Sequence, residues 1–125
     1  SSAASDVYKR QVGNYVYENL KSNNVLINKP QGGFYLLPEF INKKFSTSTE
    51  LCDNILKETG VALLPGSDFG FSEKKMLARL SYTDFDGENF MNSTVHNEEI
   101  NYEKIKKHAP KIIEGINRLK DWSNN

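Results

Sequence analysis

Arg79 is the residue of this sequence best suited to bind a ligand. It lies in the middle of residues 78–82, whose alternating side chains predict a β-strand. Side chains of a strand point alternately to opposite faces, so Arg79 shares its face with Leu77 and Ser81 and with no other charge. A guanidinium presents a planar fork of donors that matches a carboxylate. Either this face is simply exposed to water, which the pattern alone favours, or Arg79 holds an anion.

No catalytic centre is visible elsewhere in the sequence. It has no Ser/His/Asp or Cys/His arrangement and no dinucleotide loop. Residues 66–70 lack the ending of a phosphate-binding loop and are predicted to form a tight turn. The acidic segment 84–89 does not match a calcium loop and is expected to be a solvated turn. His96 and His108 have no partner at metal-ligand spacing, so we expect no metal site.

The composition indicates one domain of a globular protein. The 125 residues carry 16 basic and 16 acidic side chains, a balance without the basic surface expected of proteins that bind nucleic acid or anionic membranes. No apolar run approaches the roughly 20 residues of a membrane span. The single cysteine, Cys52, is expected to be buried and free, which suits a cytoplasmic protein. Because no initiator methionine is present, we expect a fragment, a processed form or a recombinant piece.

The first half of the chain predicts one helix and two strands. Residues 1–5 are expected to be a disordered end or a cloning remnant, and residues 6–125 to form the domain. A helix should run from an N-cap at Asp6 to Lys21 or Ser22. Strands are predicted at 25–27 and 34–37, followed by an exposed loop at 41–46.

The second half begins with a capping box, in which Thr47 and Glu50 bond to each other's backbone. It predicts a helix over 48–59, stopped by Gly60, and then a buried strand at 61–64. Residues 90–101 read as a loop without an assignable role. A helical pattern from Tyr102 is interrupted by Pro110, where we expect a kink or a fresh start.

These elements predict an α/β (α+β) fold. Helices should cover a small, mainly antiparallel or mixed sheet in a two-layer sandwich. The connections 29–32 and 65–75 are too short to hold the crossover helices that parallel strands need.

Four phrases occur in the order found in one enzyme family. They are Lys29-Pro30-Gln31-Gly32-Gly33-Phe34-Tyr35-Leu36, Glu50-Leu51-Cys52 at a helix start, Gly60 to Gly70 with its Leu-Pro-Gly-Ser core, and Ala78-Arg79-Leu80-Ser81-Tyr82. Together they resemble the C-terminal (small) domain of class I/II aminotransferases, the fold-type I enzymes that use pyridoxal 5'-phosphate. A looser likeness extends from about Val7 to Trp122.

The resemblance implies a role for three residues. In such enzymes the small domain closes over the active site, and the position matching Arg79 grips the substrate α-carboxylate. The positions matching Gly33 and Phe34 lie beside the substrate. The substrates would be an amino acid and a 2-oxo acid, and the full-length protein would be a homodimer.

One feature of the family is missing from the sequence. Aminotransferases of this type hold the cofactor through a lysine that follows a Ser-rich strand end, and no such motif occurs here. We therefore expect the cofactor to be bound by a separate large domain. We expect the 125 residues to be inactive alone, with no catalytic or cofactor-binding residue of their own.

Two alternatives stay open. A related fold-type I lyase, which eliminates a sulfur group from an amino acid, would share the carboxylate-gripping arginine. A free-standing module that binds carboxylates without catalysis would also use Arg79.

Overall fold

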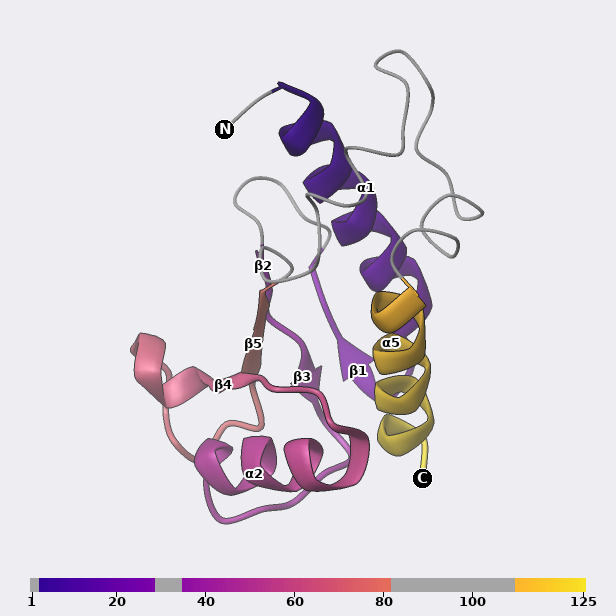
Figure 1. The fold of residues 1–125 in the computed structure, drawn as a ribbon. Helices are drawn as coiled ribbons and strands as arrows, with labels where there is room; N and C mark the ends of the chain where they lie inside the picture. The colour runs from indigo at the N-terminus through magenta and orange to yellow at the C-terminus, as the bar shows by residue number, and fades with distance from the viewer. Residues whose placement is uncertain (1–2, 29–34, 82–109) are drawn as a thin grey trace.

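The computed structural model of this chain describes residues 3–28, 35–81 and 110–125, and Figure 1 shows their arrangement. Its helices are α1 (Ala3–Leu20), α2 (Ser48–Thr59), the 3-10 helix η1 (Gly66–Phe69) and α5 (Pro110–Ser123). Its strands are short: β1 (Val25–Leu26), β2 (Tyr35–Leu36), β3 (Glu39–Phe40), β4 (Leu64–Pro65) and β5 (Ala78–Ser81). The described part is therefore an α+β structure, as predicted.

All pairing between the strands is antiparallel. Strand β5 lies between β2 and β4, and β1 pairs with β3. One register joins the two sheets, because Leu36 pairs with Leu80 and Glu39 with Leu77. Pro38 interrupts this ladder because it has no N–H to donate, although its carbonyl accepts from Ala78 N at 3.0 Å. Strands β2 and β3 are thus two parts of one extended segment.

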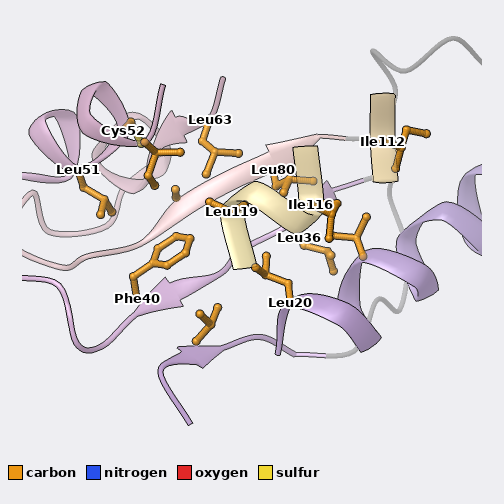
Figure 2. Close-up of a cluster of buried hydrophobic side chains, with 14 of the residues drawn as sticks. Leu20, Leu36, Phe40, Leu51, Cys52, Leu63, Leu80, Ile112, Ile116 and Leu119 are labelled. Atoms are coloured by element: carbon orange, nitrogen blue, oxygen red, sulfur yellow. The ribbon is translucent and has the colours of Figure 1, made fainter. Parts of the chain in front are cut away.

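The hydrophobic core lies between the sheets and the helices. Ala78 and Leu80 of β5 are buried, whereas the residues that alternate with them, Arg79 and Ser81, are half-buried on the opposite face. Helix α5 packs against both α1 and α2. Figure 2 shows core side chains from helices α1, α2 and α5 and from strands β2, β3 and β5; those labelled include Leu20, Leu36, Phe40, Leu51, Leu80, Ile116 and Leu119. The predicted alternation along the arginine strand is confirmed.

Helix α2 spans the predicted residues because its end signals are local. The Thr47 hydroxyl accepts from Glu50 N at 3.2 Å, and Gly60 ends the helix with a left-handed φ of +78°. The capping box is only half realised, because the Glu50 carboxylate accepts from Ser46 N at 3.2 Å instead of from Thr47. Helix α5 is described from Pro110 onward, and the residues before it, where a kink or a fresh start was predicted, lie outside the described residues.

Four sequence predictions near element ends need correction. Helix α1 begins at Ala3, so Asp6 lies inside the helix and is not its N-cap, and the expected disordered end at 1–5 contains helical residues. Strand β3 was not predicted, because we took Pro38 to end the strand and the extended chain continues past it. Strand β4 begins at Leu64 instead of Val61. It is not buried on both faces, since Ala62 and Leu64 are exposed.

The shift of β4 has a physical cause. Val61 N donates to the Thr59 hydroxyl at 3.1 Å, so the start of this segment is bonded to the end of α2 and not to the sheet. Pro65 cannot donate to a ladder, and it is tolerated because β4 is an edge strand. The segments 84–89 and 90–101, with His96 and His108, lie outside the described residues.

Cys52 is buried in the core, as predicted, with 5% of its surface exposed. Burial, with smaller contributions from the carboxylates of Asp53 and Asp68, raises the pKa of its thiol from 9.0 to about 11. The neutral thiol is therefore the stable form in the folded protein.

We predict that Cys52 reacts slowly in the native protein. At pH 8 its thiolate fraction should be about 100-fold lower than in the unfolded chain, so Ellman's reagent should label it correspondingly slowly. The stability that the neutral thiol gives over a Cys52→Ala variant should be fully present below pH 9.0 and lost as the pH rises toward about 11. Native labelling as fast as that of the urea-unfolded chain would contradict this prediction.

Candidate functional site

Arg79 stands at the centre of the candidate site. It lies on the middle strand of the three-stranded sheet, directly opposite Leu64 of β4. Because its neighbours Ala78 and Leu80 point into the core, the arginine points to the other face of the sheet. The site is therefore built on the face of β5 that points away from the core of the described residues.

Two aromatic rings flank the guanidinium. The Arg79 Cζ atom lies 4.5 Å from the centroid of the Phe69 ring and 5.1 Å from that of Tyr35. Tyr35 belongs to β2 and Phe69 to η1, which follows β4, so the rings come from elements on opposite sides of β5. A guanidinium over an aromatic face is attracted by the electrons of the ring. Both rings are exposed, at 43% for Tyr35 and 38% for Phe69, so they form part of the outer surface.

One donor of the guanidinium lacks an acceptor. Its Nε atom is buried and has no hydrogen-bond partner. Two ion pairs of the described residues lie elsewhere, between Lys21 and Glu18 and between Arg118 and Glu114. A buried donor without a partner costs about 1–3 kcal/mol. A carboxylate would bind the donors at the outer edge of the guanidinium, which is the chemistry that the sequence pattern left open.

The turn that carries Phe69 is tied to the sheet and to α2. Gly66 N donates to Leu77 O at 2.8 Å, and a Cβ atom at Gly66 would lie 2.9 Å from that same oxygen. The Ser67 hydroxyl bonds to that of Ser48 at 3.2 Å. Gly70 closes the turn with a φ of +91°, which glycine adopts without strain. The predicted tight turn at 66–70 is thus a 3-10 turn that fixes the position of the Phe69 ring.

The two hollows found on the surface do not contain Arg79. One, of about 450 Å³, lies between the 59–62 segment and the first half of α5. The other, of about 460 Å³, is lined by the β1 region, Leu37, Phe71 and Lys75. Neither of these two hollows is lined by Arg79, whose side chain is half-buried beside the exposed rings of Tyr35 and Phe69. A ligand held there would need further walls to be enclosed.

Within the described ranges, neither a metal site nor a cofactor lysine is found. No group of three or more His, Cys, Asp or Glu there could hold a metal ion. Every lysine described is exposed or half-buried, and none lies in an enclosed site. No helix of this part is long and apolar enough to cross a membrane.

The predicted site residues are only partly visible. Gly33 and Phe34 lie outside the described residues, so their expected place beside a substrate stays a prediction. Neither Tyr35 nor Phe69 was predicted to lie beside Arg79. The sequence features that could have pointed to these residues are the outward position of Tyr35 in β2 and the place of Phe69 in a turn bounded by glycines. Neither feature shows which strands pair, so neither places the two rings beside Arg79.

Known proteins similar to this chain are aminotransferases. It is 31% identical over 80 residues to an aspartate aminotransferase of Sulfolobus acidocaldarius, a match to 62% of this chain and 20% of that protein. It is 41% identical over 63 residues to a probable N-acetyl-LL-diaminopimelate aminotransferase of Bacillus subtilis, a match to 50% of this chain and 15% of that protein. The chain thus spans a fifth or less of these curated relatives. No protein-family model matches the sequence.

The fold is also that of an aminotransferase domain. The crystal structure of an aromatic aminotransferase from Pyrococcus horikoshii aligns with 97% of this chain and 24% of its own length, with a TM-score of 0.60 and 24% identity. The resemblance to the small domain of fold-type I aminotransferases is therefore confirmed in sequence and in fold.

Proposed function

We propose that this chain is the C-terminal, carboxylate-binding domain of a pyridoxal phosphate-dependent aminotransferase that moves an amino group between an amino acid and a 2-oxo acid. The observation that carries the proposal is Arg79, a half-buried cation with a buried Nε donor that lacks an acceptor, on the face of β5 away from the core of a domain with an aminotransferase fold. The similar proteins are named as aminotransferases, which supports the same reaction class for the protein as a whole.

The described residues suit the substrate and not the cofactor. Arg79 offers a fork of donors for a carboxylate, whereas no described lysine lies in an enclosed site. When bound by a separate large domain, pyridoxal 5'-phosphate would supply the electron sink for breaking the bond between Cα and hydrogen. The 125 residues would then be inactive alone, because they bind only one end of the substrate.

In this proposal Arg79 orients the substrate. Two parallel hydrogen bonds from its guanidinium to the α-carboxylate fix the direction of the Cα–H bond, and such charge-assisted bonds contribute about 1.5–3 kcal/mol each. The rings of Tyr35 and Phe69 beside the guanidinium keep water from part of its surface. Gly33 and Phe34, which precede Tyr35, would add contacts on the side of β2.

The half-buried position of Arg79, beside the exposed rings of Tyr35 and Phe69, fits closure against a second domain. A salt bridge on a wet surface is weak, while the same pair shielded from water is strong. The large domain would supply the missing walls of the site. Assembly of the whole protein as a homodimer and a place in the cytoplasm complete the proposal.

Binding of a simple dicarboxylate tests the role of Arg79. Succinate should raise the melting temperature of the native protein, expressed from its whole gene, and Arg79→Ala should abolish that rise. Arg118→Ala is the matched control, because Arg118 is an exposed arginine of α5 paired with Glu114. A succinate effect that survives Arg79→Ala would contradict the assignment of this site.

A further inference from the structure

We propose that Phe69 is a positioning residue for Arg79. Its ring, with that of Tyr35, holds the guanidinium so that a carboxylate approaches the N–H groups at the edge of the guanidinium plane and not its flat face. The inference rests on the proposed function, in which Arg79 binds the substrate carboxylate. It assigns to the 66–70 turn a role in binding that the sequence patterns did not indicate.

The strand order places the two rings on either side of the arginine. Strand β5 has β2 on one side and β4 on the other, and η1 continues directly from β4. The Cζ atom of Arg79 lies over both rings, at 4.5 Å from Phe69 and 5.1 Å from Tyr35. With rings on two sides, the remaining approach to the guanidinium is along its edge. That edge carries the donors that bind a carboxylate in bidentate fashion.

The buried Nε atom supports this arrangement. Tyr35 and Phe69 are themselves exposed, yet the Nε atom between them has almost no contact with solvent and no acceptor. A long arginine side chain on a sheet surface would ordinarily keep its head in water. Here the rings hold it in a pose that leaves Nε buried without a partner, and a carboxylate would bind the donors at the outer edge of the guanidinium.

Phe69 rather than Tyr35 is the better candidate for control of this pose. Its ring is the closer of the two, and its backbone belongs to a turn fixed at both ends. Gly66 begins this turn with a hydrogen bond to Leu77 in the segment that leads into β5, and Gly70 ends it. The turn and the arginine strand are therefore joined at Leu77, two residues before Arg79. Any shift of the turn would move the ring relative to the guanidinium.

The chain offers a matched control for substitution of Phe69. Phe71 is equally exposed, at 39% against 38%, and follows the same turn. The cation nearest its ring is Lys75, at 6.0 Å from the centroid. Phe69→Leu keeps an apolar side chain and removes the aromatic face, whereas Phe69→Tyr keeps that face. Phe71→Leu makes the same chemical change away from Arg79.

Affinity for succinate, measured by calorimetry on the native protein, tests the proposal. Phe69→Leu should weaken binding about tenfold, within the range of one cation–π contact. Phe69→Tyr should restore wild-type affinity, and Phe71→Leu should leave it unchanged. In turnover assays Phe69→Leu should raise KM for the amino acid more than it lowers kcat, because the arginine is still present. Wild-type affinity in Phe69→Leu, or a failure of Phe69→Tyr to restore it, would overturn the proposal.

A second measurement needs no ligand and covers the case in which a variant folds poorly. In the wild-type protein, ring currents should displace the NMR signal of the Arg79 side-chain N–H from its usual position, and Phe69→Leu should reduce that displacement. An undisplaced wild-type signal would also overturn the proposal.

The Arg79→Ala variant distinguishes failure of the proposed function from failure of the role of Phe69. If it leaves succinate binding intact, the proposed function fails; if it abolishes binding while Phe69→Leu does not weaken it, only the role of Phe69 fails.

Discussion

Replacing Arg79 with lysine is expected to lower kcat/KM of the native protein about 100-fold, the equivalent of one lost charge-assisted hydrogen bond of up to 3 kcal/mol. Lysine keeps the positive charge but offers a point charge in place of a planar fork. The carboxylate would lose its second hydrogen bond, and with it the fixed direction of the Cα–H bond. The rings of Tyr35 and Phe69 would also lose the flat cation that they flank. Steady-state kinetics with a range of amino acids measures the effect.

Arg118→Lys is the control for this substitution. Arg118 lies on α5, where its guanidinium contacts Glu114 on the exposed helix surface. Exposed ion pairs of this kind contribute about 0–1 kcal/mol, so stability should hardly change and turnover not at all. Unchanged turnover in Arg79→Lys, together with unchanged turnover in Arg118→Lys, would show that the arginine of β5 does not hold the substrate.

Truncating Phe40 to alanine is expected to destabilise the domain by about 3–5 kcal/mol, the usual cost of removing a large aromatic side chain from a core. Phe40 is fully buried and packs edge-to-face on Trp122, with ring centroids 5.4 Å apart. Its backbone N–H donates to Met76 O at 2.8 Å, which ties β3 to the segment before β5. The Phe40 side chain thus connects the sheet with helix α5. Figure 2 shows its position in the core.

Urea denaturation of the Phe40→Ala variant measures this cost. Phe71→Ala is the matched control, because Phe71 is exposed and its truncation should change stability by less than about 0.5 kcal/mol. Equal losses in the two variants would contradict the central position of Phe40 in the core.

Elements with local end signals were predictable from the sequence. Helix α2 follows from Thr47 before it and Gly60 after it, and both signals act within a few residues. The start of α1 was missed because its first residues, Ala3 to Ser5, carry no apolar period.

Strand bounds were less predictable because pairing is not local. The pattern at 61–64 looks like a buried strand, but the ladder forms at Leu64 and Pro65, opposite Arg79 and Ala78. Likewise, Pro38 reads as the end of a strand, and only the partner segment before β5 shows that the extended chain resumes at Glu39. The bounds of β4 depend on pairing across the intervening turn, and those of β3 on pairing of Glu39 with the more distant Leu77.

The same limit applies to the candidate site. Arg79 stands out from the strand pattern, and its outward direction follows from alternation alone. Its two aromatic neighbours do not, because Tyr35 and Phe69 reach it through the strand order β2-β5-β4. That order cannot be read from spacing, and it turns a single arginine into a site with three side chains.

Amino transfer by the native protein tests the central claim most directly. The protein expressed from its whole gene, loaded with pyridoxal 5'-phosphate, should convert an amino acid to its 2-oxo acid in repeated turnovers only when a second 2-oxo acid is supplied as acceptor. Acceptor-dependent turnover is the result that our account predicts. Keto-acid formation that continues without an acceptor would indicate a lyase instead, and the absence of turnover with every amino acid tested would leave a carboxylate-binding module and contradict the assignment as an aminotransferase.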